Sequence, residues 1–143
     1  MIERILLPTD GSEAAENAVD KAYELAEKFD ADLHALYVIE TEALPAFTNL
    51  DTEPMREAHK RRGEDLLAEI EANAPDGVIV TKAIEEGHAE STIVEYAKDH
   101  DVDVITMGTH GRGGLGRVLI GSVTERVLRE APCSVMVTPV EEA

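Results

Sequence analysis

Residues 107–122, with the sequence MGTHGRGGLGRVLIGS, contain six of the ten glycines in the chain. Glycine loses more conformational freedom on folding than any other residue, so this many glycines indicate a function that requires backbone without side chains. The stretch follows an apolar run and leads into a helical pattern that starts near Ser122. Backbone N–H groups at a helix N-terminus bind anions, most often phosphate. The stretch therefore indicates a phosphate-binding loop.

Three potentially cationic side chains, His110, Arg112 and Arg117, lie in the same stretch. Elsewhere the chain is strongly acidic, with 30 Asp and Glu against 13 Lys and Arg and a net charge of −17. This local reversal of sign favours an anionic ligand. Each of the three could instead be a solvated loop residue, and that alternative remains open.

Two common phosphate loops do not describe this stretch. A Walker A loop requires G-x-x-x-x-G-K-[ST], and no lysine follows Lys98. Residues 111–116 do match G-x-G-x-x-G, but that fingerprint belongs after the first strand and runs straight into its helix. Here five residues separate Gly116 from Ser122. We interpret the match as a coincidence.

The elements that must position this loop alternate along the chain. Apolar runs rich in Val, Ile and Leu predict strands, and apolar residues at helical spacing predict helices between them. Such an alternation predicts one α/β domain over residues 1–143, with a parallel sheet covered by helices on both faces. The predicted strands are 2–8, 33–39, 78–84, 102–108 and 134–140, and the predicted helices are 13–29, 54–74, 89–101 and 122–131.

Two serines are placed to start helices. Ser12 is the expected N-cap of the first helix. Ser122 and Glu125 spell S-x-x-E, which predicts a capping box at the helix that follows the glycine-rich stretch. The apolar stripe of the first helix comprises Ala15, Ala18, Val19, Ala22, Leu25, Ala26 and Phe29.

Composition excludes several classes of function. A chain with a net charge of −17 would repel nucleic acid and acidic membrane surfaces. No apolar run reaches the roughly 20 residues of a membrane span, and the N-terminus does not read as a signal peptide, so we expect a cytoplasmic protein. The single cysteine, Cys133, excludes an internal disulfide, and we expect it to be a small buried residue. The acidic coat suggests a high-salt cytoplasm.

The pattern Gly108-x-x-Gly111, nine residues, then Gly121-Ser122 resembles the ATP-binding signature of the universal stress protein family. The resemblance extends over the whole chain, through ILLPTDGS, LHALYVIE and the segment from VDVITMG to APCSVMV. It implies the ATP-binding branch of the family. The expected fold is Rossmann-like, with five parallel strands in the order 3-2-1-4-5.

The resemblance also implies roles for individual residues. Asp10 would accept hydrogen bonds from the ribose, Val38 at the end of the second strand would contact adenine through its backbone, and Gly108 would lie against the ribose. Asp10 could instead serve only its Asp-Gly turn, and Ser122 could serve only as a cap. The implied nucleotide-binding set is Pro8, Thr9, Asp10, Val38, Met107, Gly108, His110, Gly111, Arg112, Gly121, Ser122 and Val123.

No nucleophile–base–acid set accompanies the loop, and Asp10 is the only acid expected in the site. We therefore expect a nucleotide-dependent regulatory module without dedicated metal ligands, in which Mg²⁺ or Mn²⁺ could accompany the ATP. A slow ATPase is the alternative, and a protein that interacts independently of nucleotide is a third. The last strand is an expected sheet edge, through which family members commonly form homodimers, although Pro139 would limit the pairing.

Overall fold

A computed structural model describes residues 1–40, 53–109 and 121–139 of the chain. Five parallel strands form one sheet in the order β3-β2-β1-β4-β5, as predicted. The strands are β1 (Arg4–Pro8), β2 (Asp32–Glu40), β3 (Val80–Gly87), β4 (Val104–Gly108) and β5 (Ser134–Thr138). The helices are α1 (Glu13–Phe29), α2 (Glu53–Ala72), α3 (Ala89–Asp99) and α4 (Ser122–Glu130).

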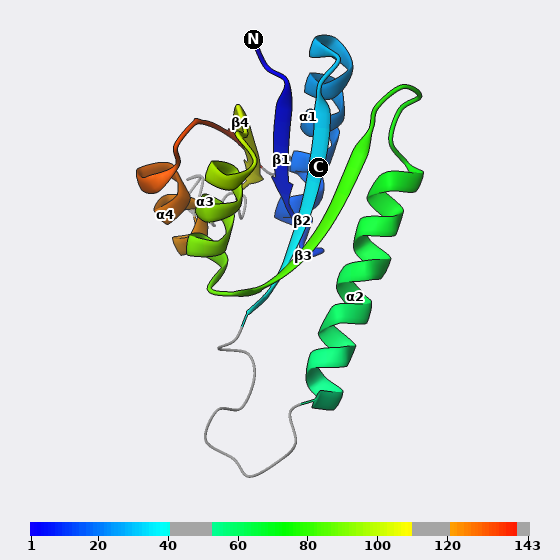
Figure 1. Cartoon of the computed structure of the whole chain (residues 1–143), viewed down its shortest axis with the longest axis vertical. Helices are drawn as coiled ribbons and strands as arrows, with labels where there is room; N and C mark the ends of the chain where they lie inside the picture. Colours follow the sequence, from blue (N-terminus) through cyan, green and yellow to red (C-terminus); the bar gives the residue numbers. More distant parts are fainter. Residues whose placement is uncertain (41–52, 110–120, 140–143) are drawn as a thin grey trace.

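Helices cover both faces of the sheet, with α1 and α2 on one face and α3 and α4 on the other (Figure 1). Alternate residues of the central strands therefore enter two separate cores. In β1, Ile5 and Leu7 pack under α1 and α2, whereas Leu6 packs on the side of α3 and α4. Both cores are built almost entirely from aliphatic side chains, which explains why the strand sequences are continuously apolar.

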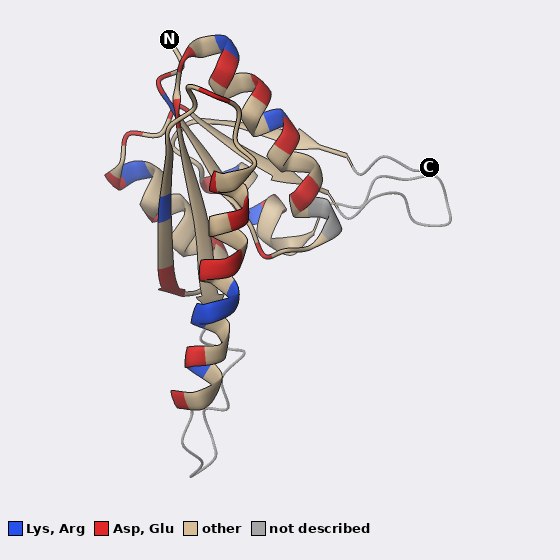
Figure 2. Ribbon diagram, turned by 90° about the vertical axis from the view of Figure 1, so that its right-hand side faces the viewer, with Lys and Arg blue, Asp and Glu red and all other residues tan. Residues whose placement is uncertain are grey.

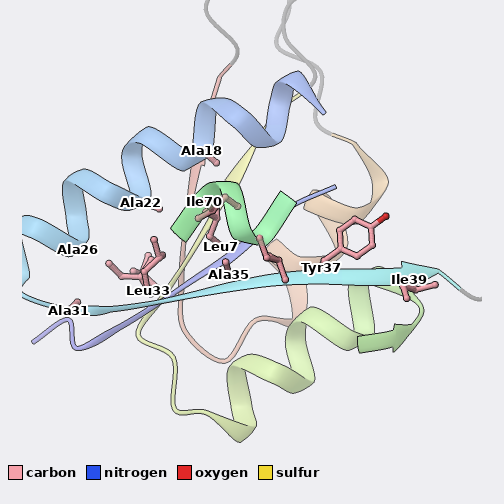
Figure 3. Packing of buried hydrophobic residues seen from close by; sticks show 13 residues of the cluster. Leu7, Ala18, Ala22, Ala26, Ala31, Leu33, Ala35, Tyr37, Ile39 and Ile70 are labelled. Carbon is pink, nitrogen blue, oxygen red and sulfur yellow. The ribbon is translucent and has the colours of Figure 1, made fainter. Parts of the chain in front are cut away.

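Helix α1 lies on the sheet through small side chains. Figure 3 shows Ala18, Ala22 and Ala26 along the side of α1 that faces the strands, and all three are buried. The predicted N-cap is confirmed, because the Ser12 side chain accepts a hydrogen bond from the Ala15 N–H at 3.2 Å. The stripe was predicted one position too long: Phe29 is 39% exposed, because it is the last helical residue before the chain turns.

Helix α2 is attached to the sheet mainly by its C-terminal half. Its buried residues are Gly63, Leu67 and Ile70, and its N-terminal half extends past the end of the sheet (Figure 1). The Tyr23 hydroxyl of α1 donates to the Ile70 carbonyl at 2.5 Å, which joins the two helices on this face. Figure 2 shows that acidic residues are spread over the helices while the strands are largely uncharged.

Most differences from the predicted boundaries are small, but one affects the site. The second strand continues to Glu40, so Val38 lies inside β2 and not at its end. The last strand, β5, is an edge of the sheet as predicted. Cys133, just before β5, is half-buried against the core under α3 and α4. Within the described ranges, every helix is too short or too polar to cross a membrane.

Candidate functional site

A cavity of about 180 Å³ opens at the carboxyl ends of β1, β2 and β4. Its walls also include the start of α3 and the start of α4. The strand order reverses between β1 and β4, because β2 follows β1 on one side and β5 follows β4 on the other. In open parallel sheets this switch point is where ligands bind. The cavity therefore occupies the position that the fold favours for a site.

Most of the residues predicted for the site line this one cavity, although they come from four separate parts of the chain. Their gathering follows from the parallel sheet, which brings the carboxyl ends of neighbouring strands to one edge. Three predicted residues, His110, Gly111 and Arg112, lie outside the described residues, as does Arg117. Those that line the cavity are Pro8, Thr9, Asp10, Val38, Met107, Gly108, Gly121, Ser122 and Val123.

The turn between β1 and α1 forms one wall of the cavity. Asp10 Oδ1 accepts a hydrogen bond from the Ser12 N–H at 2.8 Å, and Thr9 Oγ1 accepts one from the Gly11 N–H at 3.3 Å. Gly11 has a φ of +80°, a left-handed conformation that favours glycine. Asp10 thus stabilises the Asp-Gly turn, which is the alternative role that the sequence analysis left open. Its side chain is also exposed at the cavity, so one carboxylate can take both roles.

The start of α4 forms the opposite wall, and here the predicted capping box is wrong. The N-cap is Gly121, with φ −68° and ψ 162°, and Ser122 is already the first helical residue. Among the described residues no side chain caps this helix, and the Glu125 carboxylate accepts from Arg129 instead of reaching back. A serine one position inside the helix is no longer placed to bond the N3 amide. Ser122 is exposed and lines the cavity, and its hydroxyl is not used as the N-cap.

The Gly121 backbone conformation is one that any residue adopts, because its φ is negative. Conformational freedom therefore does not explain this glycine. Gly121 lines the cavity at the N-cap of α4, where a residue without a side chain leaves the backbone accessible. The helix N-terminus also leaves its first N–H groups without intrahelical partners. The geometry suits the approach of an anion to the backbone.

Strand β2 contributes a row of cavity residues, of which sequence reasoning predicted Val38 and missed Leu36 and Glu40. Leu36, Val38 and Glu40 alternate along the strand and all line the cavity, so its floor is apolar and its rim acidic. The prediction that Asp10 is the only acid in the site is wrong, because Glu40 also lines the cavity. Because residues two apart on a strand lie on the same face, the predicted Val38 could have indicated Leu36 and Glu40. The other lining residues that were missed are Ser12, Ala15, Ala89, Ile93 and Thr124.

The fold and the site together define an α/β protein with a ligand cavity at the switch point of a 3-2-1-4-5 sheet. Comparison with known proteins identifies the protein family within this fold class. The family model described as the universal stress protein family matches residues 1–139. The chain belongs to the universal stress protein family.

Individual relatives agree with this assignment. A universal stress protein of Methanocaldococcus jannaschii is 37% identical over 141 residues, which cover 96% of this chain and 82% of the relative. A solved member of the family from Burkholderia pseudomallei is 28% identical with a TM-score of 0.80, covering 96% of each chain. Hypothetical protein MJ0577, whose biochemical function was assigned from its structure, has a TM-score of 0.86 at 28% identity and covers 100% of this chain and 99% of its own.

Two further solved structures contain adenine nucleotides. One is a universal stress protein family protein from Arabidopsis thaliana with AMP bound, 20% identical with a TM-score of 0.72, covering 97% of this chain and 92% of that one. The other is a universal stress protein in complex with cAMP, 22% identical with a TM-score of 0.66, each chain being covered to 98%. At these identities the likeness to our chain shows a shared fold.

Proposed function

We propose that this protein is a cytoplasmic, ATP-binding universal stress protein that acts as a nucleotide-dependent regulatory module. The observation that carries the proposal is the cavity at the switch point, which is lined by most of the residues that the family resemblance implies. The cavity combines an apolar floor, the carboxylates of Asp10 and Glu40, and the N-terminus of α4, which no described side chain caps. Those features suit the base, the ribose and the phosphates of a nucleotide. Proteins of the same fold bind AMP and cAMP, which supports the same ligand class here.

The adenosine would lie toward β1 and β2. Leu36 and Val38 of β2 and Ile93 of α3 all line the cavity and pack in the same apolar cluster, which suits a flat base. The free oxygen of the Asp10 carboxylate would accept from a ribose hydroxyl, as acids do in dinucleotide sites. Gly108 at the end of β4 would let the sugar approach the backbone.

The phosphates would lie at the start of α4. Backbone N–H groups of Gly121, Ser122 and Val123 and the Ser122 hydroxyl are the donors proposed there. His110, Gly111 and Arg112, outside the described residues, are proposed to complete the phosphate site. Within the described residues, no group of three His, Cys, Asp or Glu side chains is arranged to hold a metal ion. We propose that any Mg²⁺ or Mn²⁺ comes with the triphosphate.

A single-turnover assay of phosphate release distinguishes a regulatory module from a slow ATPase. For a regulatory module, phosphate release from bound ATP is no faster with the wild-type protein than with a Gly121→Val control. Faster release with the wild type alone would favour the ATPase and contradict the regulatory proposal.

We further propose that the protein forms a homodimer through β5. Among the described residues the strand is a sheet edge, paired on one side by β4 alone, and Met136 on it is 37% exposed. Light scattering after size exclusion would give twice the 15.5 kDa mass of the chain for a dimer. The Met136→Lys variant would give the mass of a monomer. Elution of the wild type as a monomer across micromolar concentrations would contradict the dimer.

The nucleotide itself is tested by native mass spectrometry of protein purified without dialysis. An added mass of ATP or ADP, one per chain, supports the proposal. The Gly121→Val variant is the control, because Gly121 lines the proposed phosphate part of the cavity and valine adds bulk at that position. Purification of both proteins without nucleotide, followed by failure of added ATP to bind, would refute the proposed function.

A further inference from the structure

Helix α2 contacts the Asp10 turn from outside the cavity. Arg62 Nη2 donates a hydrogen bond to the Asp10 carbonyl at 3.2 Å, across 52 residues of sequence. One helical turn further, Leu66 approaches Gly11: a Cβ built on Gly11 would lie 3.1 Å from Leu66 Cδ1 and 2.9 Å from Arg62 Nη2. Positions i and i+4 share one face of a helix. The turn is therefore hydrogen-bonded to Arg62 and lies close to Leu66 on the same face of α2.

The next residue of α2 explains why Arg62 reaches the turn. Gly63 is buried against the ring of Tyr37 in β2, and a Cβ there would lie 2.5 Å from Tyr37 Cδ1. Glycine thus lets this part of α2 lie close to the sheet. Arg62, immediately before it, is carried alongside the end of β1, where the Asp10 turn begins.

The turn carries the carboxylate that the proposed function assigns to the ribose. Asp10 bonds to α2 through its carbonyl oxygen and to the Ser12 amide through its carboxylate. The hydrogen bond from Arg62 to the Asp10 carbonyl restricts the backbone from which the Asp10 carboxylate extends. Interactions that hold a binding group in place beforehand reduce the ordering cost of binding.

We infer that Arg62 is a positioning residue for the nucleotide site, which acts by holding the Asp10 turn and not by touching the ligand. The inference rests on the proposed function for its effect on affinity. The hold on the turn itself can be measured without nucleotide. Neither the family signature nor the lining of the cavity includes Arg62.

Calorimetric titration of ATP tests the effect on affinity. Loss of a hydrogen bond from a charged donor predicts about a tenfold weaker Kd for Arg62→Gln. Arg62→Lys keeps a cationic donor and recovers part of that loss. The matched control is Arg61→Gln, which makes the same charge change on the neighbouring exposed residue of α2 and leaves Kd within about twofold. Equal weakening by both glutamine variants would overturn the inference, because general charge would then explain it.

A double-mutant cycle tests whether Arg62 acts through Asp10. In an Asp10→Asn background, Arg62→Gln should change Kd by less than about twofold, because the ribose carboxylate is already absent. A further tenfold loss in that background would overturn the positioning role and indicate direct contact with the ligand.

Hydrogen exchange of the ligand-free protein tests the hold on the turn independently. The Ser12 amide, which donates to Asp10 Oδ1, should exchange at least about fivefold faster in Arg62→Gln than in Arg61→Gln. Equal exchange in the two variants would overturn the inference even if ATP binds. Failure of the wild type to bind ATP, with faster exchange in Arg62→Gln, would refute the proposed function and retain the hold of Arg62 on the turn.

Discussion

The ring of Tyr37 lies directly over Gly63, so that a Cβ on Gly63 would be 2.5 Å from Tyr37 Cδ1 and 2.9 Å from Cγ. Tyr37 is only 5% exposed and belongs to the core under α1 and α2, where Figure 3 shows it on β2. A buried ring has little space to move aside. This contact sets how closely α2 approaches the sheet.

Gly63→Ala should therefore destabilise the protein despite the better helix propensity of alanine. Overpacking in a core costs about 1–3 kcal/mol, against a gain of about 1 kcal/mol from propensity. We expect a net loss of about 1 kcal/mol in the free energy of unfolding, measured by urea denaturation. The control is Ala68→Gly, an exposed site on the same helix, which should lose about 1 kcal/mol from propensity alone. A more stable Gly63→Ala variant would show that α2 is not held against Tyr37.

Ser122→Ala should separate ligand binding from helix capping. Because Ser122 makes no cap bond, the substitution should change the free energy of unfolding by less than about 0.5 kcal/mol. Loss of a hydroxyl donor to phosphate should weaken ATP binding about threefold to tenfold. Ser12→Ala is the contrast: it removes a real N-cap and should cost about 1 kcal/mol. A similar loss of stability in both variants would restore the capping role of Ser122.

Stability should depend on pH through a buried histidine between β2 and α3. His34 Nδ1 lies 2.8 Å from the Tyr96 hydroxyl, and the Tyr96 ring stacks on His100 at 3.8 Å between ring centroids. Burial lowers the pKa of His34 below its ordinary value, His100 and Arg4 lower it further, and Asp32 opposes them. The unfolded chain then binds more protons than the folded one at mildly acidic pH.

The stability that neutral His34 provides is therefore complete above pH of about 6.5 and is lost as the pH falls toward the folded pKa. Urea denaturation between pH 7 and pH 5 should show this decline. His34→Gln, which cannot titrate, should flatten the decline, and His59→Gln on α2 should leave it unchanged. An identical pH dependence in wild type and His34→Gln would contradict this assignment.

Salt should stabilise the protein, because its net charge of −17 makes the folded chain repel itself. Raising KCl from low to molar concentration shortens the Debye length to about 3 Å and screens that repulsion. We expect the Tm in differential scanning calorimetry to rise across this range. A Tm that stays flat or falls would contradict both the repulsion and the high-salt origin.

The sheet could be predicted from the sequence because its strands are continuously apolar and alternate with amphipathic helices. The placement of Asp10 and Gly108 at one edge of the sheet could also be predicted, because parallel strands place their carboxyl ends at the same edge. The helix from residue 122 was predicted, but its N-cap was placed one residue too late, because the S-x-x-E pattern fits local capping by Ser122 while Gly121 is the N-cap in the fold. Glu40 was missed because β2 extends further than its apolar run. The contact of Gly63 with Tyr37 joins residues far apart in sequence, and no local pattern indicates it.

The most direct test of the nucleotide site is calorimetric titration of ATP into nucleotide-free wild-type protein and into Gly121→Val. We predict saturable binding of one ATP per chain to the wild type and no measurable binding to Gly121→Val, with an unchanged circular dichroism spectrum. Absence of binding to the wild type, or equal binding by both proteins, would contradict a nucleotide site at the start of α4.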